Sequence, residues 1–281
     1  LGVLSKEQAD TLSYFEYTTL LAMLVYEKCD YVVLEAGLGG EFDATNVFDK
    51  TLSLFTPIDI DHQAFLGDDI VSIAGTKFRS MQSSAILGRQ VHPEVEEIYR
   101  DIAQERGCSA QQIDDLLSLS QQQQIQDIAS ENGLAAYLQE NLLLALSALK
   151  YLGFEADVHR LSSSALFGRL SRVRENVLLD VGHNVLAAEA IAKALQGQKF
   201  TLVYNSYRDK DYAKIIKTLK PIVNEVELIA VDDVRIEQET HLREVIMAEG
   251  LSVTKFDTIE EDKKYLVFGS FSVAEAFLEH L

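Results

Sequence analysis

Residues Tyr31–Gly67 decide the fold, with the sequence YVVLEAGLGGEFDATNVFDKTLSLFTPIDIDHQAFLG. The stretch begins with a short apolar run that ends in a carboxylate at Glu35, and three glycines follow within Gly37–Gly40. This pattern predicts a buried strand, Tyr31–Glu35, which delivers an acidic side chain to the edge of a sheet where glycines let the backbone turn.

A second apolar run with the same ending lies at Thr51–Ile60 and is followed by Asp61 and His62. If the two runs form neighbouring parallel strands, Glu35 and His62 lie at one carboxyl edge, where open α/β sheets bind ligands. A carboxylate and an imidazole leave room for water and phosphate oxygens, which suits Mg²⁺. From the residues alone, Glu35 serves equally well as a helix cap, and the glycines as a purely structural turn or as an anion-binding nest.

Three blocks of this sequence resemble the folylpolyglutamate synthase/dihydrofolate synthase family of the Mur-ligase superfamily. Gly37–Asn46 is similar to the family's GLGG-x-x-DATN block, Asp61–Gly67 to its DHxxxLG block, and Asp180–Asn184 (DVGHN) to its DGAHN block. The blocks follow the family's order over nearly the whole chain. The resemblance implies an α/β, Mur-ligase-like fold with a central-sheet ATPase domain and a C-terminal Rossmann-like domain.

We expect the central ATP- and Mg-binding domain at residues 1–161, a linker at 162–165, where the residues are small and polar, and the ligase domain at 166–281. In the last part, apolar runs alternate with helical patterns, which predicts a parallel sheet covered on both faces. The predicted strands are Asn176–Asp180, Phe200–Asn205, Glu225–Val231, Val253–Phe256 and Tyr265–Gly269, and the predicted helices are Val185–Leu195, Asp211–Ile222, Thr240–Glu249 and Phe271–Leu281.

In the first part, four segments show helical spacing or helix-start signals: Gln8–Lys28, the stretch from Asp68 to Met81, His92–Arg106 and Ala135–Leu152. We place Tyr14, Phe15 and Tyr17 of the first helix in the core, and we predict a further strand at Ser84–Gln90. The glutamine-rich stretch Ser109–Glu131 reads as a solvated excursion without an assigned function.

Composition narrows the class of protein. A net charge of −19 argues against nucleic acid and anionic lipid as partners, while hydrophobic content of 47% is that of an ordinary globular protein. The sequence has no run long enough to span a bilayer and no visible signal peptide. Cys29 and Cys108 are too few for a disulfide framework and indicate reduced thiols. We expect a cytoplasmic monomer that acts on small molecules.

The resemblance also implies roles for individual residues. Glu35, His62 and Lys77 are the expected Mg²⁺ ligands, because the family's lysine at this place is often carbamylated and then offers an anionic oxygen. The sequence after Lys77, KFRSM, departs from the family's KAGI, and Glu41 stands where many relatives carry Arg. From the sequence alone, Lys77 is a surface lysine on a helix.

In the second half, the resemblance implies a nucleotide site. Arg169, in a segment similar to the family's P-G-R, is expected to act with Lys77 as a catalytic group and to contact the ATP phosphates. Asn141 is expected near the adenine, and Asp180 and His183 near the ribose and base. Without the resemblance, Arg169 is a salt-bridged surface residue, Asn141 is surface polar, and Lys210 is solvated charge.

The implied activity is an ATP-dependent amide ligase that adds L-glutamate to dihydropteroate or to a reduced folate through an acyl phosphate. Two alternatives stay open: a Mur-type ligase of cell-wall precursors, and a truncated nucleotide-binding module without catalysis. No run of residues in this sequence matches the superfamily's G-x-x-x-x-G-K-[ST] loop. Gly75–Lys77 has similar residue types but falls inside a predicted helix. We therefore expect that the N-terminal part of the ATPase domain is missing and that these 281 residues alone turn over no ATP.

Overall fold

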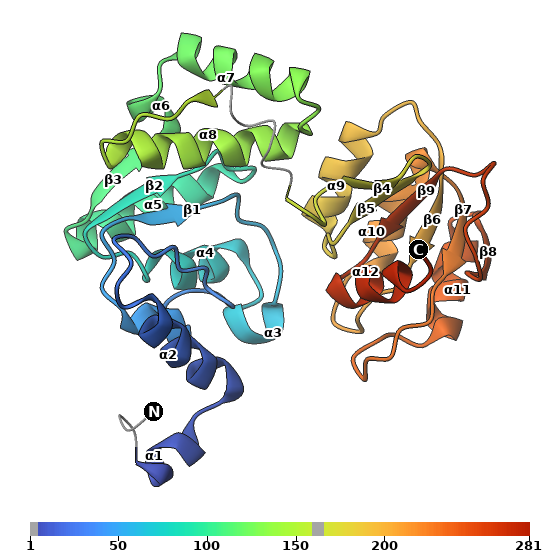
Figure 1. Ribbon diagram of the computed structural model, residues 1–281, viewed down its shortest axis with the longest axis horizontal. Coiled ribbons are helices and arrows are strands. Elements are labelled where there is room, and N and C mark those ends of the chain that lie inside the picture. Colours follow the sequence, from blue (N-terminus) through green and yellow to red (C-terminus); the bar gives the residue numbers. More distant parts are fainter. Residues whose placement is uncertain (1–4, 159–165) are drawn as a thin grey trace. The chain divides into compact units, whose positions relative to one another are not determined.

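The computed structural model describes residues 5–158 and 166–281, so the predicted linker at 162–165 lies outside the described residues (Figure 1). The chain forms two compact units. The first comprises Leu1–Gln122 and Asn141–Ala156, and the second comprises Gln123–Glu140 and Asp157–Leu281. Each unit has its own β-sheet.

The first unit is built on three parallel strands in the order β1-β2-β3, with helices packed around them. In chain order its elements are α1 (Lys6–Thr11), α2 (Tyr14–Tyr26), η1 (Ala44–Val47), β1 (Ser53–Phe55), α3 (Gln63–Leu66), α4 (Ile70–Phe78), β2 (Ser84–Leu87), α5 (Pro93–Arg106), β3 (Ser109–Gln112) and α6 (Ile113–Leu116). Helices α7 (Leu119–Glu131) and α8 (Ala136–Tyr151) contribute residues to both units.

An aromatic cluster holds α4 and α5 against the first sheet. The ring of Phe78 lies 4.9 Å from that of Phe55 and 5.3 Å from that of Tyr99, both edge to face. The Tyr99 hydroxyl donates to the carbonyl of Ala85 at 2.8 Å, so the one polar atom of the cluster is satisfied. This packing fixes the helix that carries Lys77 relative to strand β1.

The predicted strand at Tyr31–Glu35 is wrong. The segment belongs to no strand, and Val33 is 96% exposed. The predicted burial of Tyr14, Phe15 and Tyr17 is also wrong, because these side chains are 85%, 43% and 37% exposed. An apolar run becomes a strand only when a neighbour completes its hydrogen-bond ladder, and no described strand pairs with this one.

Two further helical predictions need correction. The helix predicted at Gln8–Lys28 is interrupted, because Ser13 caps a new helix through a capping box with Glu16. Ser109–Glu131 is not a solvated excursion but contains β3, α6 and α7. Gln122 is only 2% exposed there and donates to Asp114 and to the carbonyl of Leu117, both at 2.8 Å.

The second unit contains a six-stranded sheet in the order β4-β5-β9-β6-β7-β8. The strands are β4 (Ser171–Arg174), β5 (Val177–Asp180), β6 (Phe200–Tyr204), β7 (Val223–Leu228), β8 (Ser252–Lys255) and β9 (Tyr265–Phe268), and the helices are α9 (Val185–Ala194), α10 (Tyr212–Leu219), η3 (Lys220–Ile222), α11 (Glu239–Ala248) and α12 (Phe271–Leu278). The predicted alternation is confirmed, and only the antiparallel edge strand β4 was not predicted.

Neighbouring residues of the central strands face opposite cores, as the pleat requires. Leu202 packs with the helices α9, α10 and α11, whereas Val203 packs with α12. Helices therefore cover both faces of this sheet, and its strands are apolar on both sides, as in other parallel sheets. No described helix is long and apolar enough to cross a lipid bilayer.

Candidate functional site

The glycine loop Gly37–Gly40 packs on the end of α4. Asp43 accepts hydrogen bonds from the backbone N–H groups of Leu38 and Thr45, each at 2.9 Å. The N–H of Glu41 donates to the carbonyl of Thr76 at 3.0 Å. Because the N–H groups of Leu38 and Glu41 are already used within the protein, the structural turn is favoured over an anion-binding nest.

We expect Gly40→Ala to lower the free energy of unfolding by about 1–3 kcal/mol, because overpacking next to backbone cannot relax cheaply. A Cβ at this position would lie 2.9 Å from Ser80 Oγ and 3.0 Å from the carbonyl oxygen of Lys77. Gly37→Ala is the matched control, since the three atoms nearest its Cβ would all belong to the ring of Phe15, a side chain that is 43% exposed. Urea unfolding of both variants measures the difference, and equal costs would contradict the packing argument.

Lys77 lies in the last turn of α4 and is half-buried. Burial lowers the pKa of its ammonium group below the usual range, and the negative charge of Asp61 partly opposes this shift. A lower pKa leaves more of the neutral amine, which is the form that reacts with carbon dioxide. Burial of this lysine therefore favours the neutral amine over the ammonium form.

The strand expected at Thr51–Ile60 is shorter than predicted, because β1 covers only Ser53–Phe55. Asp61 and His62 therefore lie several residues beyond the strand, and His62 is the N-cap of α3. His62 has φ of 53°, which is the left-handed region that non-glycine residues rarely occupy. Its backbone N–H donates to Asp61 Oδ1 at 2.8 Å, and its Nε2 lies 3.8 Å from Asp61 Oδ2. Glu35, in contrast, is exposed and lies in an irregular segment that belongs to no helix or strand.

In the second unit, the carboxylate of Asp180 is 3% exposed and lies at the end of β5. It accepts hydrogen bonds at 2.8 Å from the hydroxyl of Tyr137 and from the backbone N–H groups of Leu170 and Gly182. Arg169 precedes Leu170 in the loop before β4. Sequence reasoning missed Tyr137, because only the fold brings it to Asp180 from 43 positions away.

The remaining predicted residues, four in number, lie in different surroundings. His183 is half-buried, with Nδ1 3.2 Å from the carbonyl oxygen of Val181. Asn184 caps α9, because its side chain accepts a hydrogen bond from the N–H of Ala187. Asn141 is exposed on α8. Lys210 is 8% exposed, so its interpretation as solvated charge is wrong.

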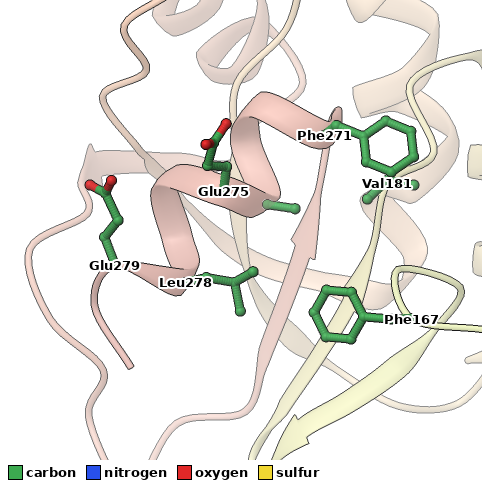
Figure 2. Close-up of a pocket in the computed structure, with 7 residues that line it drawn as sticks. Phe167, Val181, Phe271, Glu275, Leu278 and Glu279 are labelled. Atoms are coloured by element: carbon green, nitrogen blue, oxygen red, sulfur yellow. The ribbon is translucent and has the colours of Figure 1, made fainter. Parts of the chain in front are cut away.

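A pocket of about 520 Å³ lies beside α12 in the second unit, lined by Phe167, Val181, Phe271, Ala274, Glu275, Leu278 and Glu279. Figure 2 shows the aromatic rings of Phe167 and Phe271 flanking Val181, with Glu275 and Glu279 along the helix. The only charged groups of this lining are two carboxylates, which repel phosphate. This pocket is therefore unsuited to the phosphates of a nucleotide.

Comparisons with known proteins give folylpolyglutamate synthases among the relatives, although no family model matches the chain. The chain is 36% identical to Helicobacter pylori folylpolyglutamate synthetase, covering 99% of this chain and 72% of that one with a TM-score of 0.75. It is 25% identical to the Yersinia pestis bifunctional folylpolyglutamate synthase/dihydrofolate synthase complexed with AMPPNP and Mn ion, with a TM-score of 0.76 and coverage of 96% and 72%.

Among curated proteins, the dihydrofolate synthase/folylpolyglutamate synthase of Escherichia coli is 34% identical over 236 residues. The match covers 76% of this chain, and the chain spans only 55% of that relative's length. The Mur-ligase-like α/β fold predicted from the sequence is confirmed by these likenesses. The chain belongs to the folylpolyglutamate synthase/dihydrofolate synthase family.

Proposed function

We propose that this chain carries ATP-binding and ligase parts of an enzyme that adds L-glutamate to dihydropteroate or to a reduced folate. The observation that carries this proposal is the 36% identity to a folylpolyglutamate synthetase over 99% of the chain. A relative from Escherichia coli, 28% identical, is described in complex with DHPP and ADP. The relatives named here are folate ligases, which favours a folate substrate over a cell-wall precursor.

In the proposed reaction, the γ-phosphoryl group of ATP moves to a substrate carboxylate, forming an acyl phosphate and releasing ADP. The amine of L-glutamate then attacks the acyl carbon, the C–N bond forms, the amine loses a proton and phosphate leaves. The protein contributes positioning and charge neutralisation to such a reaction. Arg169 is the cationic side chain that we assign to the phosphoryl oxygens, and Lys77 acts on them through the metal ion that it helps to hold.

We assign Mg²⁺ to His62, Lys77 and Glu35. His62 Nε2 lies 3.8 Å from Asp61 Oδ2, and the negative charge of Asp61 acts on Lys77. These neighbours support a site at which an imidazole and oxygen ligands bind a hard cation. Glu35 is exposed, and in this proposal it binds the metal from the irregular segment at residues 31–36. When bound, Mg²⁺ supplies charge neutralisation of the phosphates.

Lys77 holds this cation as a carbamate in our proposal. The neutral amine attacks carbon dioxide, an N–C bond forms and one proton is released, which converts a cation into an anionic oxygen donor. The lowered pKa of Lys77 supports the step, because more of the neutral amine is present than for an exposed lysine.

For the nucleotide, we assign Asn141 to the adenine, Asp180 and His183 to the neighbourhood of the ribose, and Arg169 to the phosphates. His183 supports this assignment by lying at the turn after a parallel strand, where α/β sheets bind ligands. L-glutamate- and folate-dependent release of ADP by the full gene product tests the proposed function. Binding of ATP without any such turnover would favour the non-catalytic module.

We expect Glu35→Gln to raise the Mg²⁺ concentration needed for half-maximal turnover by about 10–100-fold, the usual effect of disturbing the surroundings of a metal. Glu97→Gln, at another exposed carboxylate of the same unit, is the matched control. Titration of turnover with Mg²⁺ measures both. An unchanged Mg²⁺ dependence in Glu35→Gln would remove this residue from the proposed ligand set.

A further inference from the structure

The buried carboxylate of Asp180 is almost fully used within the protein. Its Oδ2 accepts from the Tyr137 hydroxyl and from the Leu170 N–H, and its Oδ1 accepts from the Gly182 N–H, all at 2.8 Å. The residue is 3% exposed. A carboxylate oxygen has two lone pairs, so Oδ2 is saturated and Oδ1 is bound to buried backbone.

One of these donors lies in a strained loop. Leu170 has φ of 49°, in the left-handed region that a leucine adopts only when its surroundings compel it, and Gly168 has φ of 82°. The carbonyl of Gly168 accepts from the N–H of Val181 at 2.9 Å, and its own N–H donates to Ser171 Oγ at 3.0 Å. Arg169 lies between these two anchored positions.

Tyr137 completes the arrangement from α8. Burial, and next the negative charge of Asp180, raise the pKa of its hydroxyl well above the usual range, while the positive charge of Arg169 acts in the opposite direction. The hydroxyl therefore stays protonated and donates to Asp180 throughout the physiological pH range.

We propose that Asp180 and Tyr137 are positioning residues that hold the Gly168–Leu170 loop, and with it Arg169, in the conformation that meets a phosphate. Asp180 then acts through the loop and not as a direct ligand of the ribose, so this inference refines its assignment above. The inference rests on the proposed function in one respect, namely that Arg169 contacts the phosphates of ATP.

Binding of ATP and of adenosine separates positioning from direct contact. Asp180→Asn keeps the shape of the side chain but replaces one carboxylate oxygen with an amide NH₂ group. That group cannot accept hydrogen bonds from the donors that Asp180 binds. We expect the affinity of this variant for ATP to fall at least about tenfold, as for the loss of a charged hydrogen bond, while adenosine binding changes less than about twofold. Equal losses for ATP and adenosine would overturn the proposal, because a direct ribose contact affects both ligands.

Two further variants, Tyr137→Phe and Leu170→Gly in the Asp180→Asn background, test the positioning role separately. Tyr137→Phe should weaken ATP binding selectively, whereas Tyr151→Phe should not. Tyr151 is the matched control, because it lies on the same helix and its hydroxyl bond, to Ser84 Oγ, is also 2.8 Å long. Leu170→Gly, which relieves the left-handed strain, should restore ATP affinity to Asp180→Asn within about threefold of the parent. Failure of either expectation contradicts the positioning role.

Amide hydrogen exchange tests the loop independently of nucleotide binding. The Leu170 N–H should exchange at least about threefold faster in Asp180→Asn and in Tyr137→Phe than in the parent, because its acceptor is removed or loosened. If the parent binds neither ATP nor adenosine, the proposed function fails, and the exchange rates still decide whether Asp180 and Tyr137 hold the loop. Unchanged exchange at Leu170 in both variants would overturn it.

Discussion

Lys77→Ala is expected to reduce folate- and glutamate-dependent ATP turnover by about 10²–10³-fold, the usual effect of removing one electrostatic group at a reacting centre. The side chain lies on a helix that packs tightly on the first sheet, so its removal leaves the fold intact. Steady-state turnover of the full gene product measures the effect. Lys217→Ala, at an exposed lysine of α10, is the control and should retain full activity.

Two additions separate the carbamate from the plain ammonium as the working form of Lys77. Short carboxylic acids should partly restore activity to Lys77→Ala if a carbamate oxygen is what was lost. Lys77→Arg, which keeps the positive charge but forms no carbamate, should then stay inactive. Full activity of Lys77→Arg without any rescue of the alanine variant would leave only a phosphate contact.

The pH dependence of turnover follows from the direction of the Lys77 pKa. Because burial lowers this pKa, the neutral amine accumulates at a lower pH than for an exposed lysine. Carbamylation, and activity that depends on it, should therefore rise with pH at saturating bicarbonate. An ammonium role predicts the opposite, since the charge is lost over the same range.

His62→Gly is expected to raise the free energy of unfolding by about 0.5–1 kcal/mol and to lower turnover by about 100-fold. The gain comes from φ of 53°, a conformation that costs histidine energy and glycine very little. The loss comes from removal of the imidazole that we assign to Mg²⁺. Urea unfolding and turnover of the same preparation measure the two opposite effects.

His62→Ala is the matched variant, because it also removes the imidazole but keeps a Cβ in the left-handed region. It should lose activity as His62→Gly does, without the gain in stability. Equal stability of the alanine and glycine variants would show that the backbone at position 62 is not strained. Retained activity in both would exclude His62 from the metal site.

Local sequence was sufficient wherever the decisive interactions are close in the chain. Asp69 caps α4, Pro93 starts α5, Asn184 caps α9, and Gly153 follows α8 with φ of 81°. Each of these roles depends on hydrogen bonds or backbone angles within a few residues, so the residue type predicts it. The family blocks and the strand–helix alternation of the second unit could be predicted because they too are patterns of residues that are close in the chain.

Features that depend on distant partners could be known only from the folded chain. The run Tyr31–Glu35 has the composition of a strand, but composition cannot supply the neighbouring strand whose backbone would pair with it. The charged strand β4 was missed for the converse reason, because it is a strand through its pairing with β5 and not through its own composition. Burial of Gln122 likewise depends on acceptors that the fold brings to it.

The candidate site also combines features that local sequence predicts with features that only the fold supplies. Asp180 was recognisable from its motif, yet its three donors come from α8, from the loop before β4 and from the next turn. The salt bridge between Glu41 and Arg79, two positions where the chain departs from the family's pattern, joins residues 38 apart. Such pairs form because backbone packing brings the two side chains together, which residue types and spacing along the chain do not specify.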